Sequence, residues 1–234
     1  MNQPEGKILV ELQSWMGGDV DIANAAWTST YDKARREDRY DDPEKVANIV
    51  RRLIMDGHGT PIESVVFRFW IRMPIFTDRQ HVTHRIASHN GLSGRYRTMP
   101  EDWFQLPEDV NAIINKATVG GGLQARYEES CKLATENYKY TIEALKKAEK
   151  EGWITNKEFK RVREVVRGQL PTAGMVERTT IMNLRSFANY QFQRNSEHAQ
   201  PEIKLVAQLK LAAVKEANIA PAAIATLEEL GWNI

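Results

Sequence analysis

The stretch Phe76–Arg97, FTDRQHVTHRIASHNGLSGRYR, says more about the fold and function of this chain than any other. Against the single acid Asp78 it holds seven basic or imidazole side chains: Arg79, Arg85, Arg95, Arg97, His81, His84 and His89. From Pro74 to Ile86 the apolar residues recur with a spacing that predicts a helix with one buried face. Asn90-Gly91 and Ser93-Gly94 break this pattern, so we expect the cations and a turn at one helix end. Arginine forks, hydroxyls and glycine-exposed N–H groups bind phosphate, and the stretch therefore predicts an anion site.

The rest of the composition excludes several classes of protein. The 234 residues include 32 Lys and Arg and 31 Asp and Glu, so the global charge favours neither nucleic acid nor membrane binding. No apolar run approaches the roughly 20 residues of a membrane span, and the N-terminus MNQPEGK lacks the form of a signal peptide. Cys131 is the single cysteine, which excludes an internal disulfide framework. We expect a soluble, cytoplasmic protein without a metal site.

Sequence periodicity predicts both strands and helices. Alternating β-formers predict strands at residues 7–15, 64–73 and 179–181. Asp42-Pro43 is a helix start with Gly57 as the stop, and an uninterrupted apolar stripe predicts a long helix over 124–151. Further helices are expected near Asp21, after Thr155, and over 202–215 and 221–230, whereas the charged stretch 32–42 is expected to be a solvated connection.

The motif His84-Arg85 resembles the signature of the flavin-dependent thymidylate synthases. In that family Arg-His-Arg is followed by seven residues and then Ser, and here seven residues separate Arg85 from Ser93. Thr83 occupies the place of the first arginine, and Gly91 stands where family members commonly carry Glu. The signature is therefore kept with two departures.

Other segments resemble the same family in the same order. His58-Gly59-Thr60-Pro61-Ile62-Glu63 is similar to a His-x-Thr-Pro-apolar-Glu segment that precedes the signature. Arg167 begins a segment similar to the Arg-x-x-L-P element, and 183–189 looks like the flavin-contacting helix. Arg194 with His198-Ala199-Gln200 resembles the closing Arg-x-x-x-His-Ala-Gln. The common order across 57–202 argues against coincidence.

The resemblance implies a single α+β domain over 1–234, with an antiparallel sheet flanked by long helices, that works as a homotetramer. FAD would be the cofactor, with NADPH and methylenetetrahydrofolate as co-substrates and dUMP as the substrate. The implied nucleotide contacts are Gln80, His81, Thr83, Gly91, Leu92, Ser93, Gly94, Arg95 and Arg167. The implied flavin contacts are Thr60, Thr83, His84, Arg85, Gly91, Asn183, Arg185, Asn189 and His198. Arg194 would be the catalytic residue.

Methylation of uracil requires that C5, a poor carbon nucleophile, be activated, and two routes can achieve this. One route to a nucleophilic C5 adds a cysteine thiolate to C6, but Cys131 lies on an apolar stripe, where a thiol is usually inert. The other route polarises the ring with a fixed cation beside N3 and O2, the role implied for Arg194. A flavin then supplies the hydride, which no side chain can do.

Alternative interpretations remain open at this stage. A diverged enzyme could act on another pyrimidine nucleotide or form a hydroxymethyl product, and Thr83 and Gly91 are the departures that allow this. The chain could also bind flavin or nucleotide without turnover. An RNA-binding protein should spread its cations along a face with aromatic platforms, whereas here they gather at a predicted turn.

Overall fold

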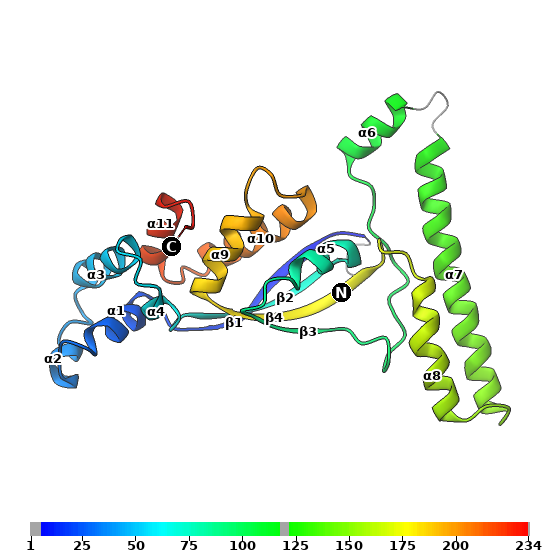
Figure 1. Ribbon diagram of the computed structural model, residues 1–234, viewed down its shortest axis with the longest axis horizontal. Helices are drawn as coiled ribbons and strands as arrows, with labels where there is room; N and C mark the ends of the chain where they lie inside the picture. Colours follow the sequence, from blue (N-terminus) through cyan, green and yellow to red (C-terminus); the bar gives the residue numbers. More distant parts are fainter. Residues whose placement is uncertain (1–5, 118–121, 234) are drawn as a thin grey trace. The chain divides into compact units, whose positions relative to one another are not determined.

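The computed structural model describes residues 6–117 and 122–233 and contains one four-stranded sheet (Figure 1). Its strands are β1 (Leu9–Met16), β2 (Val66–Pro74), β3 (Ser88–Gly91) and β4 (Met175–Asn183). They are antiparallel and lie in the order β1-β2-β4-β3. Long helices accompany the sheet, so the predicted α+β class is confirmed.

The chain divides into two compact units. Unit 1 comprises Met1–Lys7, Arg72–Arg79 and Gly91–Glu177, and unit 2 comprises Ile8–Ile71, Gln80–Asn90 and Arg178–Ile234. Because each unit is assembled from separate segments, neither corresponds to one half of the sequence. The single domain expected for 1–234 stays a prediction.

Unit 2 builds its core from the sheet and from α9 (Leu184–Arg194) and α10 (Pro201–Glu216). Burial alternates along β2 as predicted from Val66 to Ile71, with Phe67 and Phe69 fully buried, but Arg72 is also buried. The ring of Phe187 on α9 lies 5.2 Å from that of Phe67, centroid to centroid, and 6.1 Å from that of Phe69. These aromatic contacts fix α9, the helix that carries several predicted site residues, against the sheet.

The remaining helices of unit 2 are α1 (Asp19–Trp27), α2 (Lys33–Glu37), α3 (Pro43–Met55), α4 (Gly59–Ile62) and α11 (Pro221–Glu229). Asp42 caps α3 by accepting a hydrogen bond from the backbone N–H of Lys45, as the Asp-Pro start predicted. Two short helices were not predicted, since α2 forms inside the charged stretch 32–42 and α4 occupies an expected turn. In α2 the local reason is Asp32, whose side chain caps the backbone N–H of Arg35.

Unit 1 contains the helical pair α7 (Gly122–Lys150) and α8 (Asn156–Val166), which lie side by side, with α6 (Glu108–Ala117) against α7 (Figure 1). Thr155 and Glu158 form a capping box that begins α8. Cys131, Tyr138 and Ile142 are buried along α7, so the predicted stripe is a packing surface. Within the described part of the chain, no helix combines the length and apolarity needed to cross a membrane.

The predicted helix over Pro74–Ile86 is shorter in the structure. Helix α5 (Ile75–His81) ends five residues early, and β3 replaces the turn expected around Asn90-Gly91. Val82 and Ile86 are exposed, at 37% and 77%, so their helical spacing does not mark a buried face. The sheet supplies β3 with hydrogen bonds that local periodicity does not reveal.

Candidate active site

A pocket of about 630 Å³ opens in unit 2, between α9, the segment after α5, and the C-terminal residues. Six of the side chains predicted to contact flavin line it: Thr83, His84, Arg85, Asn183, Arg185 and Asn189. Seven further lining residues were not predicted: Glu63, Ile86, Ser186, Phe192, Gln193, Trp232 and Asn233. The pocket combines cationic and amide groups with aromatic rings, and its size is that of a small-molecule site.

The start of α9 presents three of the predicted side chains. Asn183 is the helix N-cap, and its Oδ1 accepts a 2.8 Å hydrogen bond from the N–H of Ser186. This cap fixes the first turn and leaves the amide NH₂ of Asn183 for other partners. Arg185 and Asn189 are four residues apart, so they share one helix face, and both line the pocket.

Arg185 is held by its surroundings. Its Nη1 lies 2.9 Å from Oε1 of Glu63 in an ion pair. A Cβ added at Gly59 would lie 2.7 Å from Nε of Arg185, closer than such atoms approach in proteins. Gly59 therefore provides the space in which the guanidinium lies against α4.

Arg194, the predicted ring-activating residue, ends α9 and contacts the residues before β3. Its Nε donates to Nε2 of His84 at 2.9 Å, and its Nη2 donates to Oγ1 of Thr83 at 3.2 Å. The backbone oxygen of Gln80 lies 3.5 Å from the same Nη2. Among the described residues, Nη1 of Arg194 has no hydrogen-bond partner. One end of the guanidinium is thus held while the other keeps two donor hydrogens.

His84 must be neutral to accept this bond, with its hydrogen on Nδ1. Its environment enforces that state, because burial and the adjacent Arg194 lower the pKa of His84 to about 4. The ring of His84 also packs against Tyr190, with 4.6 Å between centroids.

A buried polar cluster supports this region from within the core. His81 is fully buried, and its two ring nitrogens lie 3.0 Å from the hydroxyl of Tyr190 and 2.9 Å from that of Thr180. Nδ1 of His89 lies 3.2 Å from the hydroxyl of Thr180. His81 has no exposed surface in this structure, so its side chain belongs to the core, and its predicted contact with the nucleotide stays a prediction.

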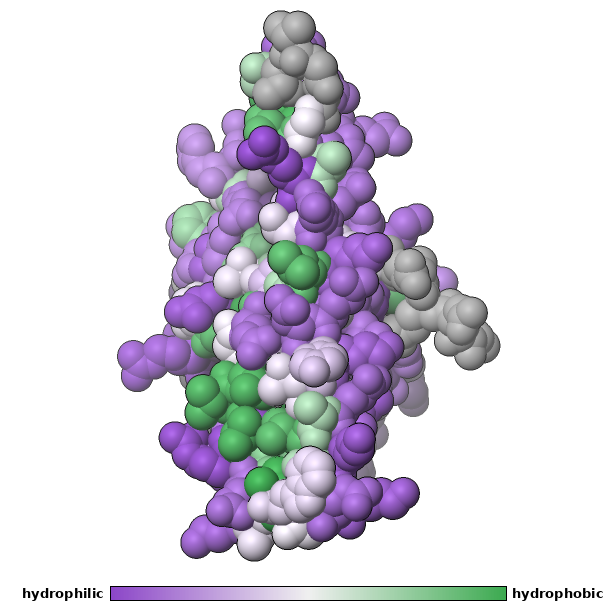
Figure 2. Space-filling model, turned by 90° about the vertical axis from the view of Figure 1, so that its right-hand side faces the viewer, coloured by the Kyte–Doolittle hydropathy of each residue, from purple (hydrophilic) through white to green (hydrophobic). Residues whose placement is uncertain are grey.

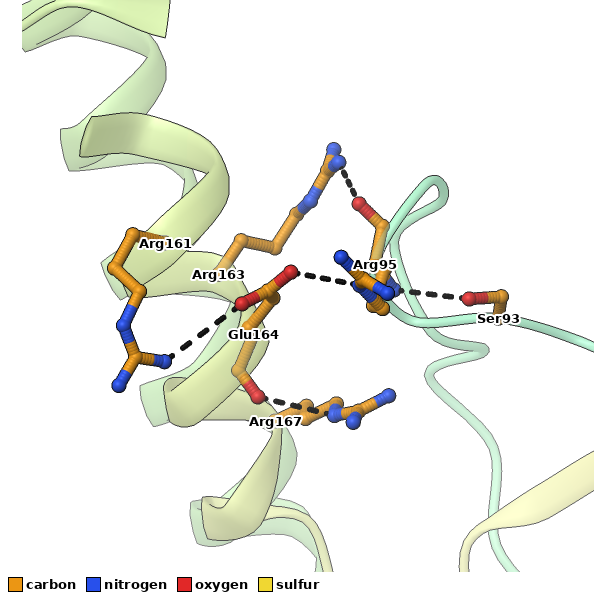
Figure 3. A network of polar contacts seen from close by, with 6 residues as sticks. All are labelled: Ser93, Arg95, Arg161, Arg163, Glu164 and Arg167. Carbon is orange, nitrogen blue, oxygen red and sulfur yellow. Dashed lines mark hydrogen bonds and ion pairs between the residues drawn. The ribbon is translucent and has the colours of Figure 1, made fainter. Parts of the chain in front are cut away.

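Unit 1 gathers arginines around one carboxylate (Figure 3). Nε of Arg95 lies 2.7 Å from Oε1 of Glu164, and Nη1 of Arg161 lies 3.7 Å from Oε2. Nη2 of Arg163 donates to the backbone oxygen of Arg95, and Nε of Arg167 donates to the backbone oxygen of Glu164 at 3.0 Å. The hydrogen bond from Arg95 lowers the pKa of Glu164 below its usual range. Two of the four arginines pair with the carboxylate of Glu164 and the other two donate to backbone oxygens, so the cluster as a whole is positively charged.

The loop before this cluster approaches it closely. A Cβ at Gly94 would lie 2.9 Å from Cδ of Arg167, so the glycine permits the packing of loop against arginine. The hydroxyl of Ser93 accepts a 3.3 Å hydrogen bond from the N–H of Arg95, and the N–H of Leu92 donates to the backbone oxygen of Glu177 on β4. Four of the predicted nucleotide contacts, Ser93, Gly94, Arg95 and Arg167, are therefore neighbours in unit 1.

Three predicted flavin contacts do not line the pocket: Thr60, Gly91 and His198, all of which are exposed. Their roles, like those of the lining residues, stay predictions. Phe192 and Gln193 could have been found from the sequence, because they follow Asn189 by three and four residues on α9. Trp232 carries no such signal, since it reaches the pocket through a C-terminal turn with a positive φ of 67°. Among the described residues, no three His, Cys, Asp or Glu side chains form a candidate metal site.

The family model described as thymidylate synthase complementing protein matches residues 11–221. The flavin-dependent thymidylate synthase of Kosmotoga olearia is 32% identical over 201 residues, which are 85% of this chain and 81% of that protein. The enzyme of the same name from Pseudothermotoga lettingae is 33% identical over 195 residues, 83% of this chain and 79% of the relative. A crystal structure of the UMP/dUMP methylase PolB from Streptomyces cacaoi, bound with 5-Br dUMP, has the same fold, with a TM-score of 0.72, 24% identity and 97% coverage of both chains.

Proposed function

Since the chain belongs to the thymidylate synthase complementing protein family, we propose that it is a methyltransferase that converts dUMP to dTMP by flavin-dependent reductive methylation. The observation that carries the proposal is the grouping of six predicted flavin contacts around one pocket, with Arg194 bonded to two of them. These six residues come from two separate parts of the sequence, the signature and the segment 183–189, and both parts line the same pocket.

The residues of the pocket fit FAD. Arg85 and Arg185 provide cations for the pyrophosphate, and the amides of Asn183 and Asn189 provide donors and acceptors for polar ring edges. Phe192 and Trp232 offer aromatic surface for a flat ring system. When bound in reduced form, the flavin would supply the hydride that completes the methyl group.

Arg194 would activate the uracil ring. C5 is a weak carbon nucleophile, and negative charge that develops on N3 and O2 must be stabilised for C5 to react. Nη1 of Arg194 has two hydrogens that the described residues leave available, and its guanidinium is fixed by Thr83 and His84. No thiolate is required, in keeping with the burial of Cys131, which raises the pKa of its thiol.

The arginine cluster of unit 1 would bind the substrate phosphate. Arg95 and Arg167 present guanidinium groups next to the hydroxyl of Ser93 and the close-packed Gly94. A phosphate dianion would take the place of Glu164 on Arg95, because it carries more charge and more acceptor oxygens. Methylenetetrahydrofolate would donate the carbon and NADPH would reduce the flavin.

We also propose that the protein is a homotetramer. Several large apolar side chains are exposed on the helices of unit 1 and the turn between them: Ile113, Leu123, Leu133, Tyr140, Trp153, Val162 and Val165. Figure 2 shows apolar surface among hydrophilic side chains on this side of the molecule. Apolar surface of this kind supports burial against another subunit, and sedimentation at several protein concentrations would measure the assembly.

The test of this proposal measures FAD binding and catalytic turnover of dUMP. Purified protein should bind FAD, seen as quenching of flavin fluorescence, and should release tritium from [5-³H]dUMP only with methylenetetrahydrofolate and NADPH present. The mass of the product distinguishes a methyl from a hydroxymethyl group. Protein that binds neither FAD nor dUMP contradicts the assignment, and protein that binds both without tritium release is a binding protein.

A further inference from the structure

We propose that Thr83 is a positioning residue that fixes the guanidinium of Arg194 in the orientation needed for ring activation. The inference rests on the proposed function of Arg194 and adds to it the residue that sets its geometry. Thr83 is also one of the two positions, with Gly91, at which this chain departs from the signature that it resembles, and the signature has an arginine there.

The direction of the hydrogen bonds around Thr83 is determined by its single hydroxyl hydrogen. Oγ1 of Thr83 donates to the backbone oxygen of Gln80 at 2.7 Å, the shorter of its two contacts. Once the hydrogen is committed there, only lone pairs remain for Nη2 of Arg194 at 3.2 Å. The backbone of α5 thus orients the hydroxyl, and the hydroxyl accepts from the arginine.

A second hydrogen bond, to His84, fixes the orientation of the Arg194 guanidinium. Nε of Arg194 donates to Nε2 of His84 at 2.9 Å, so two nitrogens of one rigid plane are held by two adjacent residues. One contact would let the guanidinium rotate about it, whereas two contacts fix the plane. Nη1 is then left facing no acceptor among the described residues, and it is the group available to N3 and O2.

The chemistry of residue 83 matters because Arg194 is a pure donor. Serine could accept the same bond, valine has the shape of threonine without the acceptor, and arginine could only donate and would repel Arg194. The hydrogen bond that holds Nη2 of Arg194 therefore depends on the acceptor oxygen that Thr83 provides in this chain. An enzyme with arginine at this position would have to hold its activating cation differently.

A purely structural role for Thr83 makes different predictions. Its bond to Gln80 also satisfies a carbonyl at the end of α5, so loss of the hydroxyl could simply loosen the turn. In that case flavin binding and KM should suffer together with kcat. If Thr83 positions Arg194, loss of its hydroxyl should mainly lower kcat, because negative charge on the ring develops only as the reaction proceeds.

The experiment compares Thr83→Val, Thr83→Ser and Thr83→Arg in FAD-loaded protein by steady-state kinetics with dUMP. Thr83→Val and Thr83→Arg should lower kcat by roughly 10- to 100-fold with KM changed less than about threefold, since misplacing a catalytic group costs up to about 100-fold. Thr83→Ser should retain kcat within about threefold. Equal losses in Thr83→Val and Thr83→Ser, or none in either, would overturn the proposal.

Thr28 provides a matched control in the same unit. Its hydroxyl donates to the backbone oxygen of Asn24 at 2.8 Å and accepts from Nη1 of Arg36 at 2.5 Å, which is the same arrangement away from the pocket. Thr28→Val should keep wild-type kinetics. A loss of kcat in this variant equal to that of Thr83→Val would mean that the effect is general, and the proposal would fail.

A second measurement does not need turnover. The N3 proton of 5-nitro-dUMP can be titrated by absorbance, and a fixed cation beside N3 should lower its pKa in the bound nucleotide. Wild type should shift this pKa downward, Thr83→Ser should keep most of the shift, and Thr83→Val should lose most of it. If wild type gives no shift, the proposed role of Arg194 is wrong; if wild type and Thr83→Val give equal shifts, only the role of Thr83 is wrong.

Discussion

In unit 1, Nε of Arg95 lies 2.7 Å from a carboxylate oxygen of Glu164, so the arginine assigned to the substrate phosphate is already in an ion pair. The pair also contacts its neighbours, since Arg161 approaches the second oxygen of Glu164 and Arg163 holds the backbone of Arg95. Any phosphate that binds Arg95 must therefore compete with Glu164, and this competition can be measured.

We expect Glu164→Gln to lower the KM for dUMP by about two- to fivefold, the scale of one exposed ion pair. The substitution removes a negative charge beside the phosphate and leaves kcat near wild type. The difference should shrink as salt concentration rises, because the groups are exposed. Glu136→Gln is the control, since among the described residues Glu136 forms one ion pair, with Lys132 on the surface of α7. A higher KM in Glu164→Gln would mean that the carboxylate orients Arg95 instead of competing for it.

Gly59→Ala should weaken flavin binding without destabilising the fold. The new Cβ would lie 2.7 Å from Nε and 2.8 Å from Cζ of Arg185, which can move away because its side chain is flexible. Displacement of one charged hydrogen-bond donor should raise the Kd for FAD by about tenfold. Gly18→Ala is the control, because no atom lies within 4 Å of its added Cβ. An unchanged Kd for Gly59→Ala would remove Arg185 from the flavin site.

Cys131→Ala should leave turnover largely intact. Cys131 is 4% exposed on the packing face of α7, and burial raises the pKa of its thiol, both of which oppose a nucleophilic role. The expected cost is about 1 kcal/mol of folding free energy from lost packing. Urea denaturation and tritium release on the same preparation would measure the two effects. Complete loss of activity in folded Cys131→Ala protein would contradict ring activation by a cation.

Lys210→Met should stabilise the protein at neutral pH. Lys210 is fully buried on α10, where its Nζ lies 4.0 Å from the ring centre of Tyr190 and 3.9 Å from the sulfur of Met182, and no acid contacts it in the described residues. The aromatic ring favours the ammonium, but complete desolvation is the larger effect and holds the pKa well below its usual value. Replacing an amine without a strong acceptor by a thioether of similar length should add roughly 1–3 kcal/mol.

The pH dependence of this effect follows from the direction of the shift. Because burial lowers the pKa of folded Lys210 well below that of the unfolded chain, the unfolded state binds more protons between the two values, and the contribution of Lys210 to the free energy of unfolding rises with pH until about pH 10.4. The advantage of Lys210→Met over wild type should therefore be largest near neutral pH and shrink toward pH 10. Lys204→Met on the same helix is the control. An advantage independent of pH would mean that Lys210 keeps its usual pKa.

Much of the fold could be predicted from the sequence because it depends on local rules. Alternation predicted β2, and the Asp-Pro start at Asp42 and the helix cap at Thr155 predicted α3 and α8. The end of α5 and the existence of β3 could not, since β3 owes its hydrogen bonds to a distant strand. Lys210 is another failure, because an amphipathic pattern gives no reason to bury a lysine at the centre of a core.

The candidate site shows the same division. The location of Arg185 and Asn189 at the pocket could be predicted because both belong to one helix with a recognisable motif, and their roles stay predictions. Trp232, which lines the same pocket, could not, since its place depends on how the C-terminal turn packs. The bond between Thr83 and Arg194 also could not be predicted, because it joins residues 111 positions apart.

The last prediction separates Arg95 from Arg194, two cations assigned to different ends of the nucleotide. Arg95 would bind phosphate equally in the ground state and the transition state, so Arg95→Ala should mainly raise KM. Arg194 would stabilise charge that develops on the ring during reaction, so Arg194→Ala should mainly lower kcat, by roughly 10²- to 10³-fold. Arg194→Lys should restore little, because lysine cannot bond His84 and Thr83 and still present a planar donor pair. Neither residue is assigned to the flavin, so FAD affinity should survive in all three variants. Steady-state kinetics with dUMP on flavin-loaded protein is the measurement, and a raised KM with an unchanged kcat in Arg194→Ala would show that Arg194 binds the nucleotide without activating its ring.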